Sequence, residues 1–243
     1  MCESCGCHDS IHAHGHSHDH PHDHGHGHPG GDSRTVEIRS SALALNQRFA
    51  DQNRGWFRAK GWTVFNLLSS PGSGKTALLE QVLRALPGSA AIVGDLATDN
   101  DAARLRRSGA PAIQIQTGTA CHLDAHQVAH AIDSLPADLP IRRLFIENVG
   151  NLVCPASFDL GEHKRIVLLS VTEGEDKPLK YPVVFATADL VLVTKTDLAA
   201  AVGWDRDAAR RAIAAAAPRA DVLEISSKTG ENLPALLDWL ARC

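Results

Sequence analysis

The sequence predicts an α/β fold in which a mostly parallel sheet has helices on both faces. Along the 243 residues, short apolar runs alternate with segments whose apolar residues recur at helical spacing. The hydrophobic fraction of 44% is enough for one full core. A strand at residues 63–68, a turn of small residues and a helix from residue 76 begin this series.

The turn at residues 69–76 reads Ser-Ser-Pro-Gly-Ser-Gly-Lys-Thr. Between a strand and a helix, such a turn directs backbone N–H groups at phosphate oxygens, which predicts a P-loop NTPase. Lys75 is expected to reach the β- and γ-phosphates, and the Thr76 hydroxyl to bind Mg²⁺. Ser69 stands where the usual pattern begins with glycine. The predicted nucleotide contacts of the loop are Gly72, Ser73, Gly74, Lys75, Thr76 and Ala77.

Three acids are expected around the phosphates. Asp95 and Glu147 each follow a predicted strand, at 90–94 and 142–146, and are expected to hold Mg²⁺ together with Thr76. Asp101 is the third predicted catalytic residue, beside Lys75 and Thr76, and would position the attacking water. Helix capping is the alternative role for Asp95 and Asp101.

The segment Glu147-Asn-Val-Gly150 is similar to the Asp-x-x-Gly of many GTP-hydrolysing proteins. Gly150 is therefore expected to bond the γ-phosphate and to lose that bond on hydrolysis.

Base recognition is predicted after the strand at 190–193, where Thr194-Lys195-Thr-Asp197 resembles the guanine-reading Asn-Lys-x-Asp. Asp197 would accept hydrogen bonds from guanine N1–H and the 2-amino group, which adenine cannot donate. The aliphatic part of Lys195 would pack on the base. Thr194 stands at the asparagine position of this motif, so a hydroxyl takes the place of the side-chain amide. Ser226, Ser227 and Lys228 are expected to contact guanine O6.

The first 33 residues are predicted to be a disordered, metal-binding tail, followed by a nucleotide-binding domain at 34–243. Cys2, Cys5 and Cys7, with the terminal amine, can bind one Zn²⁺ or Ni²⁺. Every second residue from His12 to His28 is histidine, which predicts weaker nickel storage rather than one defined site. These residues are His12, His14, His16, His18, His20, His22, His24, His26 and His28. A solvated spacer is the alternative.

A second metal site is suggested within the domain by Cys121-His122 and Cys154, which follow strands on one side of the sheet. From spacing alone, Cys154 fits a buried small hydrophobe equally well. His126 and His130 are expected with His122 on one solvated face of a helix at 123–132. A helix at 34–60, broken at Gly55 and Gly61, and a polar loop at 172–182 are also predicted.

Composition excludes other classes of protein. The net charge of −4 and the lack of a basic run argue against nucleic-acid binding. No apolar stretch has membrane-spanning length and no signal-peptide core begins the chain, so a cytoplasmic location without membrane insertion is expected. There the six cysteines would be thiols.

Together these motifs resemble the HypB family of hydrogenase nickel-insertion GTPases. The resemblance rests on the cysteine cluster, the histidine tract, the loop at 69–76, Cys121-His-Leu-Asp124, Glu147–Pro155 and Glu173–Pro178. It implies a nickel metallochaperone that hydrolyses GTP with Mg²⁺ during maturation of [NiFe]-hydrogenase, as a homodimer promoted by GTP. It also implies a tight nickel site at Cys2, Cys5 and Cys7, and a nickel or zinc site at Cys121, His122 and Cys154. The implied partners are a HypA-type maturation protein and the hydrogenase large subunit.

Three other functions are alternatives to this one. A urease-type nickel chaperone GTPase is the nearest, although that family lacks the amino-terminal cysteine cluster. A nickel storage protein with a vestigial nucleotide site would need only the tail. A small-molecule kinase would need a lid and an acceptor pocket, for which the sequence offers no candidate.

Overall fold

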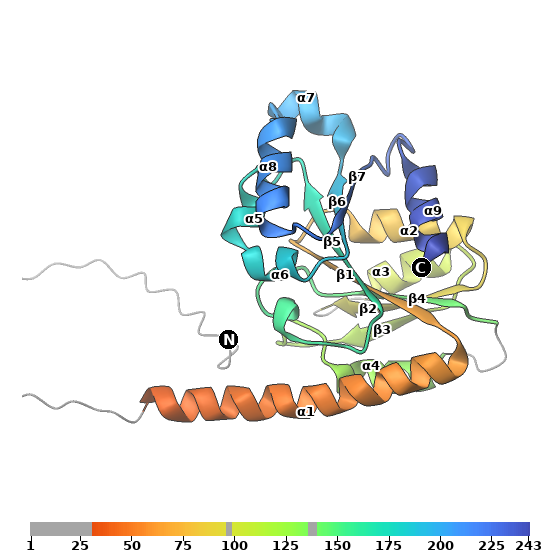
Figure 1. Cartoon of the computed structure of the whole chain (residues 1–243). Coiled ribbons are helices and arrows are strands. Elements are labelled where there is room, and N and C mark those ends of the chain that lie inside the picture. Colours follow the sequence, from red (N-terminus) through yellow and green to blue (C-terminus); the bar gives the residue numbers. More distant parts are fainter. Residues whose placement is uncertain (1–30, 96–98, 136–139) are drawn as a thin grey trace, which may run out of the picture.

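A seven-stranded parallel sheet, in the order β3-β2-β4-β1-β5-β6-β7, forms the centre of the molecule (Figure 1). The computed structural model describes residues 31–95, 99–135 and 140–243, with side chains from residue 40 onward. The strands are β1 (Thr63–Ser69), β2 (Ser89–Asp95), β3 (Ala112–Gln116), β4 (Arg143–Glu147), β5 (Lys164–Ser170), β6 (Leu190–Thr194) and β7 (Asp221–Glu224). Together with the helices, this is the predicted P-loop NTPase architecture.

Helices cover both faces of this sheet. They are α1 (Gly31–Lys60), α2 (Lys75–Ala85), α3 (Asn100–Arg106), α4 (Ala125–Asp133), α5 (Lys177–Lys180), α6 (Pro182–Ala186), α7 (Ala199–Val202), α8 (Arg206–Ala216) and α9 (Leu233–Arg242), with 3₁₀ turns η1 (Pro155–Ser157) and η2 (Thr196–Leu198). Alternate residues of a strand point to opposite faces. Phe65 therefore packs with α2, α3 and α9, whereas Val64 packs with α1 and α4, and Val167 with α6 and α8.

The helix α1 differs from its prediction. It begins at Gly31 rather than residue 34 and continues through Gly55, where a break was expected. A glycine inside a helix costs about 1 kcal/mol, and the complete burial of Ala50 and Phe57 on the same helix offsets this cost. Gly61, with φ 66°, ends the helix as predicted.

Two other boundaries were also wrong. The helix predicted from residue 123 begins at Ala125, because Asp124 and Gln127 form a capping box. His122 thus lies before α4 and is not on a helix face with His126 and His130. The predicted polar loop at 172–182 contains α5, whose end is supported by the ion pair Lys180–Asp176 at 2.6 Å.

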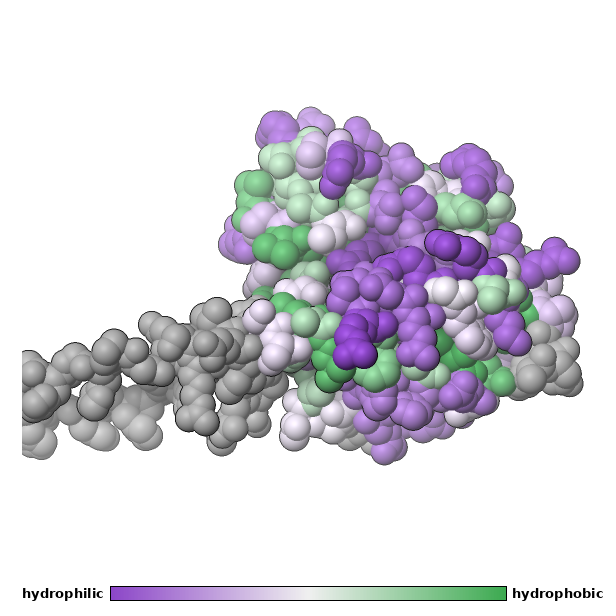
Figure 2. All heavy atoms as spheres, turned by 60° about the horizontal axis from the view of Figure 1, so that its bottom comes forward, coloured by the Kyte–Doolittle hydropathy of each residue, from purple (hydrophilic) through white to green (hydrophobic). Residues whose placement is uncertain are grey.

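Among the described helices, none combines the length and apolar character that a membrane crossing requires. Figure 2 views the molecule from the side of α1 and α4, and its coloured surface is mostly hydrophilic, with smaller hydrophobic areas.

All strands of the sheet are parallel, so their carboxyl ends meet at one edge of the sheet, where the loops carry the predicted site residues.

Candidate functional site

The phosphate loop joins β1 to α2. Gly72 and Gly74 have φ angles of 73° and 97°, a backbone conformation that glycine adopts without strain. Lys75 is buried, and its Nζ donates to Ser69 Oγ at 2.7 Å, as does Ser73 Oγ at 2.5 Å. Ser69 therefore holds the lysine at the loop, which a glycine could not do. Burial lowers the pKa of Lys75, although nearby carboxylates oppose this effect.

Opposite the lysine, Thr76 Oγ1 donates to Glu147 Oε1 at 2.7 Å. Burial raises the pKa of Glu147 to about 7, although Lys75 and the Thr76 hydrogen bond act in the other direction. Its second oxygen, Oε2, is buried and has no hydrogen-bond partner among the described residues. Carboxylate and hydroxyl oxygens are ligands that Mg²⁺ prefers. The pair therefore fits a magnesium site.

A cavity of about 430 Å³ brings these groups together. It is lined by the loop backbone at residues 71–77 and by Asp95, Asp101, Glu147 and Gly150. The predicted phosphate, magnesium and catalytic residues therefore share one space. A β-carbon on Gly150 would lie 2.9 Å from Pro71 Cα, so only glycine permits this approach of the 147–154 segment to the phosphate loop.

An adjoining cavity of about 450 Å³ contains the predicted base-reading residues. It shares Ser73 and Gly74 with the first and is also lined by Lys195, Asp197, Ser227 and Lys228. Ser226 lies beside it, and its Oγ donates to Asp197 Oδ1 at 2.6 Å. Because the two cavities share lining residues, they fit a nucleotide that has its phosphates in the first, the phosphate-end cavity, and its base in the second, the base-end cavity.

The residue at the usual asparagine position has a structural contact of its own. Thr194 is buried, and its Oγ1 donates to the carbonyl of Ser73 at 2.8 Å. Lys195, which has a left-handed backbone with φ 60°, follows it, and its Cε would lie 3.9 Å from a β-carbon on Gly74. The Thr194 hydroxyl thus joins the segment at 194–197, which carries the predicted base contacts, to the phosphate loop.

A larger cavity, about 750 Å³, lies at the amino-terminal ends of β5, β6 and β7, away from the phosphate loop. Its charged groups include Lys164 and Asp189, which pair at 2.9 Å. Asp221, also in its lining, accepts a hydrogen bond from Trp239 Nε1 at 2.7 Å. This cavity contains none of the predicted site residues.

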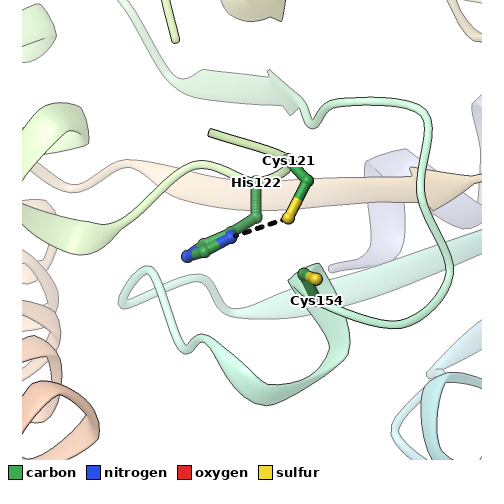
Figure 3. A group of neighbouring side chains, drawn as sticks. All are labelled: Cys121, His122 and Cys154. Atoms are coloured by element: carbon green, nitrogen blue, oxygen red, sulfur yellow. Dashed lines mark hydrogen bonds between the residues drawn. The ribbon is translucent and has the colours of Figure 1, made fainter. Parts of the chain in front are cut away.

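Cys121, His122 and Cys154 come together, with their ligand atoms all within 4.8 Å of one another (Figure 3). The first two precede α4, and Cys154 comes from the segment that crosses beneath them. Burial lowers the pKa of His122, which favours the neutral imidazole that binds metal. In a tetrahedral zinc site with these ligands the donor atoms lie roughly 3.5–3.8 Å apart, so small side-chain rotations would close the cluster on an ion.

Four asparagines connect this cluster to its surroundings, and the sequence analysis missed all of them. Asn46 and Asn53 of α1 bond the backbone of Ala125 and of residues 159–160. Asn148 Oδ1 accepts from Leu123 N at 3.1 Å, and Asn151 Nδ2 donates to Cys121 O at 3.4 Å. The two segments that carry the candidate metal ligands are thus fixed both to α1 and to each other. A signal existed only for Asn148, which lies between Glu147 and Gly150.

The remaining predicted metal ligands lie outside the described residues. These are Cys2, Cys5, Cys7 and the histidines of the tract from His12 to His28.

The chain is similar to known proteins over most of its length. Residues 63–224 match the family model "CobW/HypB/UreG, nucleotide-binding domain". The hydrogenase maturation factor HypB of Azotobacter vinelandii is 50% identical over 218 residues, covering 88% of this chain and 72% of its own. HypB of Escherichia coli K12 is 50% identical over 210 residues, covering 85% and 72%. A crystal structure of HypB from Helicobacter pylori in complex with nickel has a TM-score of 0.78 and 40% identity, covering 82% of this chain and 94% of that one.

Proposed function

Because the chain belongs to the HypB group of the CobW/HypB/UreG nucleotide-binding family, we propose that it is a nickel metallochaperone GTPase. It would bind Ni²⁺ and hydrolyse GTP to support nickel insertion into [NiFe]-hydrogenase. Its relatives are named as hydrogenase maturation factors, and the related Helicobacter pylori structure contains nickel.

The choice of GTP is supported by the base-end cavity. Asp197 presents a carboxylate there, and Ser226 Oγ already donates a hydrogen bond to one of its two oxygens. Guanine would donate two hydrogen bonds to this carboxylate, and adenine would cover it without supplying either of them. Ser227 and Lys228 would meet O6 from the facing loop.

Hydrolysis would use the residues of the phosphate-end cavity. Lys75 would leave Ser69 Oγ and neutralise charge on the β- and γ-phosphates. Mg²⁺, held by Thr76 and Glu147 with Asp95 nearby, would supply electrostatic stabilisation of the phosphate oxygens. Asp101 would position the water that attacks the γ-phosphate. The Gly150 amide would bond the γ-phosphate and lose this bond when phosphate leaves.

Metal handling would be divided between two regions. Cys2, Cys5 and Cys7 would bind nickel tightly, the histidine tract would store it weakly, and Cys121, His122 and Cys154 would bind nickel or zinc. We also propose a homodimer promoted by GTP, docking with a HypA-type protein and the hydrogenase large subunit, and a cytoplasmic location.

One observation carries this proposal: one member of the Cys-His-Cys cluster, Cys154, lies on the segment that also faces the phosphate loop. Gly150 packs against Pro71, and Cys154 follows it by four residues on the same segment. A small-molecule kinase needs no such cluster beside its phosphates, and a storage protein needs no nucleotide site.

Nickel transfer tests the proposal directly. Nickel-loaded protein is mixed with an apo hydrogenase large subunit in the presence of GTP, GDP or a non-hydrolysable GTP analogue, and acceptor-bound nickel is measured. GTP should promote transfer, and Lys75→Ala should abolish this effect together with phosphate release. Transfer that is equal in all three nucleotides would contradict the proposal, and preferential transfer to apo-urease would favour the urease-type alternative.

A further inference from the structure

The turn that carries Cys154 is held by an arginine from β5. Cys154 directly precedes the 3₁₀ turn η1 (Figure 3), and Arg165 lies on the strand that follows. The guanidinium donates from Nη1 to the carbonyl of Ala156 at 3.2 Å and from Nη2 to the carbonyl of Phe158 at 3.3 Å. One planar group thus fixes both η1 and its end, just after the candidate metal ligand.

Phe158 extends this support to a second candidate ligand. Its ring packs on the imidazole of His122, with centroids 3.9 Å apart and an angle of 35° between the ring planes. Because the backbone of Phe158 is bonded to Arg165, a movement of the arginine would shift the ring that supports His122 as well as the turn of Cys154. Arg165 is therefore bonded to the supports of two of the three ligands.

A buried carboxylate fixes the guanidinium in turn. Arg165 Nε donates to Glu162 Oε1 at 2.5 Å, and Glu162 Oε2 accepts from Leu160 N at 2.7 Å. The side chains of Arg165 and Glu162 are only 15% and 3% exposed. The ion pair uses Nε and leaves Nη1 and Nη2 for the two carbonyls, a division of donors that the fork of an arginine allows and the single nitrogen of a lysine does not.

The same carboxylate is anchored in the centre of the sheet. Glu162 Oε1 also accepts from Asn66 Nδ2 at 3.2 Å, and Asn66 Oδ1 accepts from Asn148 Nδ2 at 3.4 Å. Asn66 lies in β1, the strand that leads into the phosphate loop, and is completely buried. Hydrogen bonds in such a position do not compete with water. The ion pair is therefore held by the most rigid part of the fold, on a polar path that ends in the 147–150 segment.

We propose that Arg165 is a positioning residue for the cluster of Cys121, His122 and Cys154. Together with Glu162, it would hold the turn of Cys154 and the ring against His122 in the arrangement that binds a metal ion. This inference rests on the metal role of the cluster in the proposed function, and it names the residues that set the geometry of that site.

Cobalt absorption spectra test this role in the full chain, because Co²⁺ takes the same cysteine and histidine ligands as Ni²⁺ and Zn²⁺. Cys2, Cys5 and Cys7 are replaced by alanine in every sample, so that the tail cannot contribute a thiolate-to-cobalt charge-transfer band. The histidine tract has no thiolate and gives no such band. Cys154→Ala assigns the remaining band to the cluster. Each variant is titrated with Co²⁺, and its thermal unfolding midpoint is measured beside the spectrum.

The main variant combines Arg165→Met with Glu162→Gln, so that neither charge is left buried alone. We expect its apparent Co²⁺ affinity to fall roughly 10–100-fold and its charge-transfer band to weaken, as is typical when a partner that orients metal ligands is lost. Arg165→Lys keeps the ion pair but loses the fork, so it should show a smaller fall in affinity. The control Arg54→Lys alters the ion pair with Asp159, at 2.6 Å on the same segment, and should leave the affinity and the band unchanged.

Three results would overturn the proposal. The first is a normal cobalt spectrum and affinity in the main variant, with or without a lower unfolding midpoint, because the ion pair would then serve only the stability of the fold. The second is an equal loss of affinity in Arg54→Lys, which would assign the effect to the segment as a whole. The third applies if the main variant does not fold: Arg165→Lys then decides, and an unchanged affinity would refute the role.

Failure of the proposed function gives a different result. The chain that keeps Arg165 and Glu162 would then show no charge-transfer band that depends on Cys154. This outcome would remove the cluster as a metal site, and the positioning role with it. A band that is present but insensitive to the Arg165 variants would refute the positioning role alone.

Discussion

The side-chain oxygen of Asn148 accepts a hydrogen bond from the backbone N–H of Leu123 at 3.1 Å. Asn148 lies between Glu147 and Gly150, which line the phosphate-end cavity, and Leu123 directly follows His122. The bond is buried, so it is shielded from competition with water. This hydrogen bond therefore links the phosphate-end cavity directly to the cluster of Cys121, His122 and Cys154.

This link predicts that nucleotide and metal affinities are coupled. In protein lacking residues 1–30, nickel affinity at the cluster should differ between GDP and a non-hydrolysable GTP analogue. Nickel should change the nucleotide affinity by the same factor. Asn148→Ala should reduce this factor toward one, and calorimetric titration of nickel in each nucleotide state measures it.

A matched variant separates coupling from metal-site positioning. Asn53→Ala removes bonds to Ala125 O and Leu160 O at 2.8 and 3.1 Å but does not touch the 147–150 segment. It should weaken nickel binding equally in both nucleotide states. Equal nickel affinity with GDP and the analogue in the unmodified protein would contradict the coupling.

Guanine selection should depend on Asp197. Asp197→Asn presents an amide donor where guanine also donates, so GTP affinity should fall roughly tenfold or more and xanthosine triphosphate should bind better. Competition titrations with fluorescent nucleotide measure both. Glu231→Gln is the comparison, because Glu231 Oε2 accepts a hydrogen bond from Thr196 Oγ1 at 2.8 Å but has no predicted contact with the base, so this variant should preserve the preference for guanine. An Asp197→Asn variant that binds GTP normally would refute the assignment of this loop.

The raised pKa of Glu147 predicts a pH dependence of stability. Burial moves this pKa from its ordinary value of 4.5 to about 7, so the folded state holds a proton that the unfolded state releases. Without Mg²⁺, the contribution of this group to the free energy of unfolding is therefore greatest at low pH and declines as pH rises through about 7. Denaturant unfolding between about pH 5 and pH 8 should show this decline, and Glu147→Gln should lack it.

Magnesium should reverse this trend, because it binds the ionised carboxylate. The apparent affinity for Mg²⁺ in the presence of GDP should rise with pH up to about 7 and then level off. A pH profile unchanged by Glu147→Gln would assign the dependence to another group.

The predicted tail can be tested separately from the nucleotide-binding domain. Cys5→Ala should remove the tight nickel site, while deletion of residues 12–28 should lower only the number of weakly bound ions. GTP hydrolysis should be unchanged in both, because the cavity residues all lie beyond residue 70. Equilibrium dialysis with a nickel-specific dye gives the numbers and affinities. Loss of tight binding on deletion of residues 12–28 would contradict this division.

The contiguous parts of the candidate site could be predicted from the amino-acid sequence alone. The loop at 69–76, the Glu147–Gly150 segment and the Thr194–Asp197 segment each place their functional groups through local backbone geometry, so strand, turn and helix signals were sufficient to find them. The parallel sheet also followed from the strand and helix pattern, because parallel strands need crossover connections.

Contacts between segments that are distant in the sequence could not be predicted and are visible only in the folded chain. The tertiary structure brought Cys154 to Cys121 and His122, where spacing alone had left its role open, and it showed Ser69 and Thr194 bonding to Lys75 and to the Ser73 carbonyl. It also continued α1 through Gly55 and started α4 after His122. The intrinsic helix propensities that predict such boundaries differ by only about 1 kcal/mol per residue. Burial against the sheet and hydrogen bonds of buried asparagines outweigh them, and these depend on residues that are neighbours in space but not in sequence.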